Sequence, residues 1–78
     1  MTVQLLRLEP TVSPVIRDLK VVEDHIAKME GRIQRLRGWI EEDRAEGHPT
    51  LMSGSLLQCF EDTLSLDRCH RLDLIARL

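Results

Sequence analysis

The feature that most constrains this chain is an unbroken series of apolar residues between positions 15 and 40. They recur at alternating steps of four and three, the heptad spacing of a helix that packs along a narrow seam against a neighbouring helix. No position of the series carries a charged side chain. Its members are Val15, Leu19, Val22, Ile26, Met29, Ile33, Leu36 and Ile40.

Clear start and stop signals bound this helix. Ser13 can accept from the free amides of a first turn, and Pro14 suits the first helical position because it loses no hydrogen bond there. Gly47 takes the left-handed backbone conformation that ends a helix, and Pro49 prevents continuation. The sequence therefore predicts a helix over about residues 14–46.

A second amphipathic helix is predicted over about residues 51–77, after a turn over 47–50. Its start is open, because Thr50 is a possible N-cap and Ser55 opens a competing capping box. Its heptad line continues the packing seam with Leu57, Phe60 and Leu64, and resumes at Leu74 and Leu78.

The two positions between Leu64 and Leu74 are charged, Asp67 and Arg71. They lie one helical turn apart, so we expect them to pair with each other. This gap is either a device that sets the register of the helices or the place where another molecule binds.

Two long amphipathic helices joined by a short turn predict an all-α antiparallel hairpin over 13–78, preceded by an N-terminal arm over 1–12. One hairpin of a 78-residue chain buries too small a core to be comfortably stable alone. We therefore expect a homo-oligomer, most simply a dimer whose helices form a four-helix bundle, with an unidentified protein partner as the alternative.

Composition excludes several other classes of function. The net charge of −2 gives no overall positive field that would attract a phosphate backbone. With one Trp, one Phe and no Tyr, the chain cannot form an aromatic platform for single-stranded nucleic acid. The N-terminal residues lack the pattern of a secretory signal, and no apolar run is long enough to cross a membrane. We expect a cytoplasmic protein that does not associate with membranes, with Cys59 and Cys69 as reduced thiols.

No residue pattern predicts catalysis, a cofactor or a metal. Asp67 and His70 have the spacing of ligands in metal-binding helical bundles, but the first helix offers no carboxylate on its seam. Cys69 and His70 are neighbours on a helix, so their side chains diverge and cannot form a nucleophile–base pair. His48 in the turn is better explained as part of the cap of the preceding helix than as a site. We expect no enzyme.

Small residues recur at heptad spacing on the side of the first helix opposite the seam: Gly31, Gly38 and Ala45. Such a stripe lets another helix approach closely, although unremarkable surface glycines are the simpler interpretation. Together with Asp67 and Arg71 these residues form a possible partner face.

A basic cluster on the first helix supports a different function. It consists of Lys28, Arg32, Arg35 and Arg37. Acidic residues on the same helix favour a solvated, ion-paired surface, so binding to nucleic acid is not expected of one chain. The alternative to an interaction module is a small nucleic-acid-associated regulator, in which Arg32, Arg35 and Arg37 of two chains merge into one basic face.

Residues 32–78, from RIQRLRGWIEEDRAEGHPT to the C-terminal helix, resemble a group of short uncharacterised bacterial proteins with an Arg-rich helix, a Gly-His turn and a second helix. Where this chain has Asp67, that group often has a basic residue or His. The resemblance implies the hairpin and no activity. The matching positions are Gly47, His48, Leu56, Leu57, Phe60, Glu61, His70 and Arg71.

Overall fold

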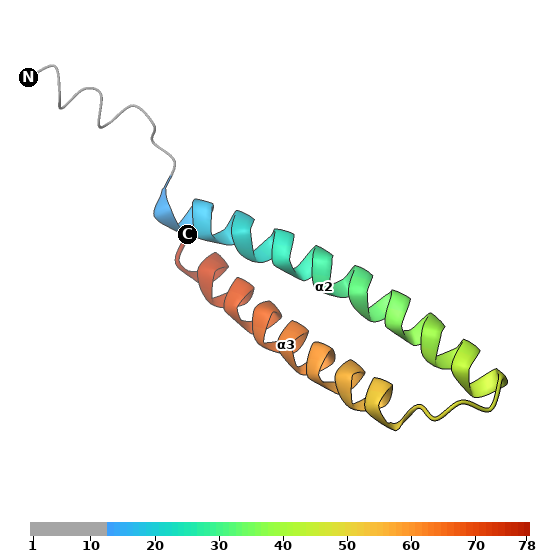
Figure 1. The fold of residues 1–78 in the computed structure, drawn as a ribbon. Helices are drawn as coiled ribbons and strands as arrows, with labels where there is room; N and C mark the ends of the chain where they lie inside the picture. The colour runs from blue at the N-terminus through green and yellow to red at the C-terminus, as the bar shows by residue number, and fades with distance from the viewer. Residues whose placement is uncertain (1–12) are drawn as a thin grey trace, which may run out of the picture.

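The computed structural model describes residues 13–78, which form two helices packed side by side as an antiparallel hairpin (Figure 1). Helix α2 spans Pro14–Ala45 and helix α3 spans Leu51–Ala76. Within 13–78 there is no strand, so the predicted all-α hairpin is confirmed. The predicted N-terminal arm over 1–12 lies outside the described residues.

Local interactions at both ends of α2 explain its length of 32 residues, about 48 Å. At the start, the Ser13 hydroxyl accepts a 3.0 Å hydrogen bond from the Val15 amide. At the end, Gly47 has a positive φ of 78° and its amide donates to the Arg44 carbonyl, while the His48 amide donates to the Asp43 carbonyl. This pair of hydrogen bonds is a Schellman cap, which satisfies carbonyls that the helix leaves free.

The start of α3 settles the alternative between Thr50 and Ser55. The helix already includes Leu51, and the Gly54 amide donates to the Thr50 carbonyl, so Thr50 holds the N-cap position. Its side chain makes no capping hydrogen bond. Ser55 lies inside the helix, and the Gln58 side chain donates to Asp62 instead of closing a capping box.

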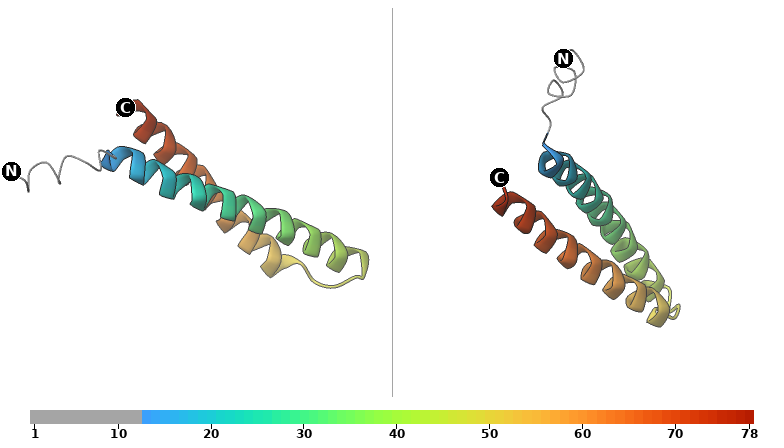
Figure 2. Two further views of the ribbon diagram at one scale, coloured as in Figure 1. Left: turned by 90° about the horizontal axis from the view of Figure 1, so that it is seen from above. Right: turned by 90° about the vertical axis from the view of Figure 1, so that its left-hand side faces the viewer.

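The core is a single layer of side chains between the two helices, which lie side by side in the right-hand view of Figure 2 and cross in projection in the view from above. Helix α2 supplies most of it through the seam residues Val22, Ile26, Met29, Ile33, Leu36 and Ile40, all buried. Leu64 and Leu74 are the buried residues of α3. Val15, Leu19, Leu57 and Phe60 pack against this core and are partly buried.

The layer is thin by the standard of a globular core. Among the described residues no large side chain is less than 2% exposed, and α3 leaves several leucines in solvent. Each helix of a hairpin has one neighbour, so one narrow stripe of its surface can be covered. None of the described helices is both long and apolar enough to cross a membrane.

Candidate interaction surface

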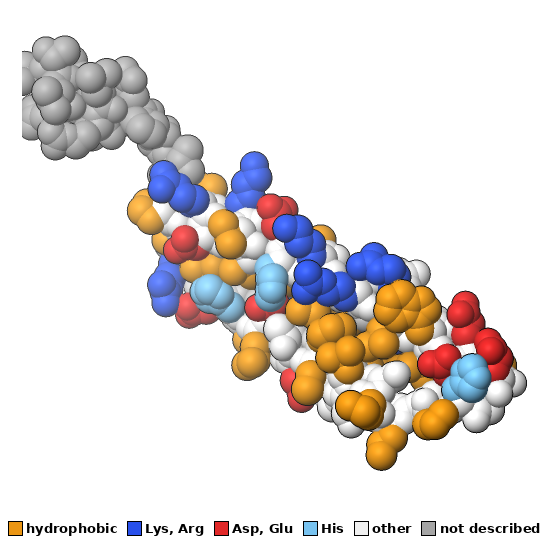
Figure 3. Space-filling model, in the orientation of Figure 1, with side chains coloured by type: hydrophobic (Ala, Val, Ile, Leu, Met, Phe, Trp, Pro, Cys, Tyr) orange, Lys and Arg blue, Asp and Glu red, His pale blue; other side chains and the backbone are white. Residues whose placement is uncertain are grey.

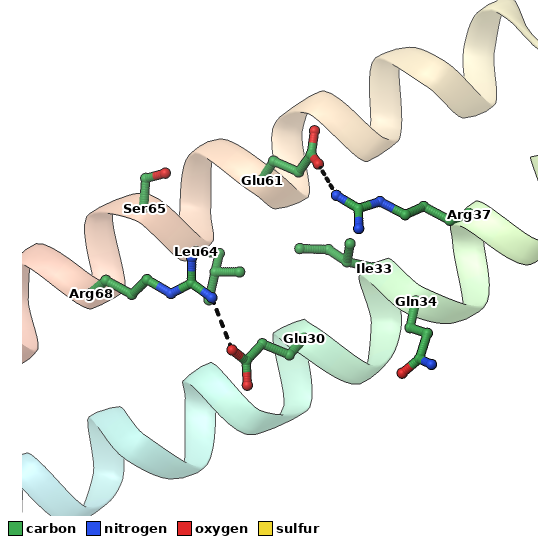
Figure 4. Close-up of a pocket in the computed structure, with 8 residues that line it drawn as sticks. All are labelled: Glu30, Ile33, Gln34, Arg37, Glu61, Leu64, Ser65 and Arg68. Atoms are coloured by element: carbon green, nitrogen blue, oxygen red, sulfur yellow. Dashed lines mark hydrogen bonds and ion pairs between the residues drawn. The ribbon is translucent and has the colours of Figure 1, made fainter.

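The seam of the hairpin has two flanks, and one of them is laced by ion pairs. Arg37 of α2 donates to Glu61 of α3, and Arg68 of α3 donates to Glu30 of α2 at 2.9 Å. The two pairs cross the helices in opposite directions and enclose a shallow pocket (Figure 4). We call these four residues, Glu30, Arg37, Glu61 and Arg68, the ion-pair face. Its charges already have partners within one chain.

The other flank is largely apolar in its turn-proximal half, whereas farther from the turn it carries the His25–Asp67 contact. Trp39 of α2 and Leu56 of α3 are 59% and 46% exposed, and a groove lies between their helices. We call the residues that line this groove the Trp39 face: Arg32, Arg35, Leu36, Trp39, Leu56 and Phe60. Figure 3 shows hydrophobic side chains gathered over the turn-proximal halves of both helices. No ion pair covers this face in the part of the chain that the structure describes.

The reason for the two unlike flanks lies in the heptad positions beside the seam. Glu30 and Arg37 each come directly after a seam residue in the sequence, which places them on one side of the seam. Arg32 and Trp39 each come directly before a seam residue, which places them on the other side. Sequence reasoning identified the seam but missed the Trp39 face as a surface. The available signal was Trp39 itself, a large apolar side chain beside a seam whose other flanking residues are mostly charged.

The basic cluster predicted on α2 is divided between the flanks. Arg37 belongs to the ion-pair face and binds Glu61, whereas Arg32 and Arg35 line the Trp39 face. Lys28, Arg32 and Arg35 are exposed, and none of the ion pairs within residues 13–78 includes them. The cluster is therefore smaller than the sequence indicated.

Asp67, one of the two charged residues that interrupt the seam, lies at the helix interface, but it does not pair with the predicted residue. The Asp67 carboxylate contacts the His25 ring nitrogen Nδ1 at 2.6 Å, across the hairpin. The expectation that Asp67 pairs with Arg71 is wrong, because α3 presents Asp67 toward α2, where His25 reaches it. Arg71 is partly buried and forms no ion pair with any residue in 13–78.

The small-residue stripe faces open space. A Cβ atom added at Gly38 would meet no other atom within 4 Å, and one at Gly31 would lie 3.6 Å from the Arg35 guanidinium. Ala45, the last residue of α2, is exposed. Apart from the Arg35 side chain near Gly31, nothing in the described part of the chain packs on this stripe, so it is a surface of the hairpin and by itself indicates no partner.

The turn is a structural cap. The His48 backbone amide completes the Schellman cap, and the His48 ring lies 3.5 Å from the Asp43 carboxylate. Pro49 is exposed and follows the cap directly.

Residues proposed from spacing as possible ligands or nucleophiles do not come together. Cys59 and Cys69 are exposed free thiols, and His70 is exposed on the outside of α3. Over residues 13–78 no group of His, Cys, Asp and Glu side chains is arranged to hold a metal ion. Comparison with known proteins found no matching protein family, no matching curated protein and no matching solved structure.

Proposed function

We propose that this chain is a protein–protein interaction or assembly module that acts as a homodimer of hairpins, with the four helices forming a bundle. The observation that carries the proposal is the Trp39 face. Its apolar groove lies beside the seam, at the side where each helix still lacks a second neighbour. Covering it with the same face of another hairpin turns the single layer of core into a two-layer bundle over the turn-proximal part of the helices.

The energetics support association. A two-helix hairpin of this size supplies little buried apolar area, so dimerisation contributes stability that the single chain lacks. Fully burying a large apolar side chain contributes about 1.5–3 kcal/mol, and Leu56, which is 46% exposed in the single hairpin, would gain roughly half of that in a complex. The ion-pair face is a poorer candidate, because burying its charges costs desolvation that their existing pairing does not offset.

Light scattering coupled to gel filtration tests the proposal. At micromolar concentration we expect a mass of about twice the 9.0 kDa of one chain. Trp39→Glu places a charge in the groove and should give a monomer that remains helical. Gln34→Glu adds the same charge beside the ion-pair face and should leave the dimer intact. A parent protein that stays monomeric at every concentration would overturn the homodimer.

A second candidate function is a nucleic-acid-associated regulator, favoured by one observation. Lys28, Arg32 and Arg35 form an exposed basic strip on α2 without partners among the described residues. Polarisation of a labelled RNA hairpin, measured over a salt series, separates the two functions. Binding that persists at 150 mM salt and is lost in Arg32→Glu would support the regulator, and no binding would count against it.

A further inference from the structure

The charges beside Trp39 change sign along α2. On the side toward the centre of the hairpin, Arg35 and Arg32 lie about one and two turns before Trp39. On the side toward the turn, Glu42 lies about one turn after it, and Glu46, the C-cap residue just past the end of α2, lies about two turns after it. All four side chains are exposed, and no ion pair within 13–78 includes any of them. Figure 3 shows the basic and acidic groups of α2 on either side of the hydrophobic patch.

This arrangement is self-complementary under a two-fold rotation. A two-fold axis perpendicular to α2 at Trp39 runs a second α2 antiparallel to the first and places residues equally far before and after Trp39 opposite each other. Arg32 and Glu46 are one heptad before and after Trp39, so they share its line on the helix. Arg35 and Glu42 are likewise opposite each other to within one residue.

We infer that a second copy of this chain covers the Trp39 face in this orientation, α2 antiparallel to α2, with the two Trp39 side chains meeting at the axis. Arg32 of each copy pairs with Glu46 of the other, and Arg35 pairs with Glu42. The inference rests on the proposed homodimer and assigns it a face, a direction and a register. Each Arg–Glu contact occurs twice, and the Trp39–Trp39 contact lies on the axis, as in an isologous interface.

Helix α3 is compatible with the same axis. The residues beside Leu56 on the exposed side of α3 are uncharged: Met52, Cys59 and Thr63. Rotation about the axis therefore brings α3 of one copy against α3 of the other without placing like charges together. Leu56 and Met52, which are 46% and 85% exposed in one hairpin, lose solvent in the dimer.

The competing arrangement has both turns at the same end, with α2 of one copy against α3 of the other. There Arg32 and Arg35 would face the uncharged stretch around Cys59 and Thr63, and neither Glu42 nor Glu46 would gain a partner. Only the antiparallel α2 pairing uses the change of sign at Trp39. Complementary charges of this kind set orientation and exclude wrong registers.

Exchange of charges tests the register directly. Arg32→Glu/Arg35→Glu and Glu42→Arg/Glu46→Arg each put like charges together, so each variant alone should have a dimer dissociation constant raised on the order of a hundredfold. An equimolar mixture of the two restores all the opposite-charge pairs and should form a heterodimer close to the parent in affinity. All four side chains are exposed, so circular dichroism should show unchanged helix content in each variant.

A matched control separates register from overall charge. Arg17→Glu/Lys20→Glu changes the net charge as much as the first variant but lies on exposed positions of α2 away from Trp39, and it should remain a dimer. Trp39 is the chain's single Trp, so a shift of its emission to shorter wavelength reports burial of this face.

The outcomes are distinguishable. Monomeric single variants that recover a dimer only when mixed support the inference. If both variants dimerise as tightly as the parent, or if the mixture stays monomeric, this register is overturned while the homodimer itself stands on the mass of the parent. A parent that is monomeric throughout removes the proposed function and the inference together.

Discussion

Residues at equivalent heptad positions of the helix interface differ in burial and in contacts. Ile33 and Asp67 occupy equivalent seam sites on α2 and α3, yet Ile33 is 5% exposed and buried among apolar side chains, whereas Asp67 relies on one contact with His25. Replacing Ile33 by a charged residue should therefore destabilise the protein, whereas replacing Asp67 by an apolar residue should stabilise it.

Ile33→Asp should unfold the hairpin. The substitution buries a carboxylate that has no partner in the middle of the apolar layer, which costs several kcal/mol, about the whole stability of a small domain. Loss of the helical circular dichroism signal at 25 °C measures this. Gln34→Asp places the same charge on the exposed neighbour and should keep the parent spectrum. A folded Ile33→Asp variant would show that Ile33 lies outside the core.

Asp67→Leu should stabilise the protein by on the order of 1 kcal/mol. Leucine continues the apolar line from Leu64 to Leu74, and the lost contact with His25 is partly solvent-exposed and weak. Thermal unfolding at a fixed protein concentration measures the change. His25→Ala serves as the control, because it removes the same contact without adding apolar burial and should shift the melting temperature little. A lower melting temperature for Asp67→Leu would mean that the Asp67–His25 contact outweighs the gain in burial.

The two helices, α2 and α3, are stabilised to different extents by capping and burial. Helix α2 has a side-chain cap at its start, a Schellman cap at its end and a full apolar seam. Helix α3 has no side-chain cap on its first turn, and α3 contributes Leu64 and Leu74 as buried residues. We expect the first turn of α3 to open most easily, since little tertiary burial offsets its fraying.

The glycines of α2 and of the turn should respond to alanine with opposite signs. Gly38→Ala should raise the free energy of unfolding by about 1 kcal/mol, because the added methyl meets no atom and the unfolded chain loses freedom. Gly47→Ala should lower it by a similar amount, because Gly47 has a positive φ that alanine adopts only with strain. Urea unfolding of the two variants in parallel gives both values. Destabilisation by Gly38→Ala would instead reveal a molecule packed closely on that stripe.

For the whole molecule, folding and association should be coupled. Only folded hairpins associate into the proposed dimer, so mass action stabilises the folded state as the chain concentration rises. The melting temperature should increase between 1 and 100 µM for the parent and stay constant for Trp39→Glu. A melting temperature independent of concentration for the parent would indicate that the hairpin is stable as a monomer.

Much of this architecture follows from interactions between residues close in the chain. The heptad series from Val15 to Ile40 defines which stripe of α2 is buried, and the observed bounds Pro14–Ala45 and Leu51–Ala76 differ by one residue from those expected. Capping and amphipathic periodicity act within one or two helical turns, so a sequence specifies them by itself.

Contacts across the hairpin were decided by the tertiary structure. That Arg37 binds Glu61, that Asp67 binds His25 rather than Arg71, and that Trp39 borders an open apolar groove all depend on the axial register and rotation of α2 against α3. Many registers bury the same apolar seams, and the choice among them is made by packing along the full length of both helices, which no local pattern of residues encodes.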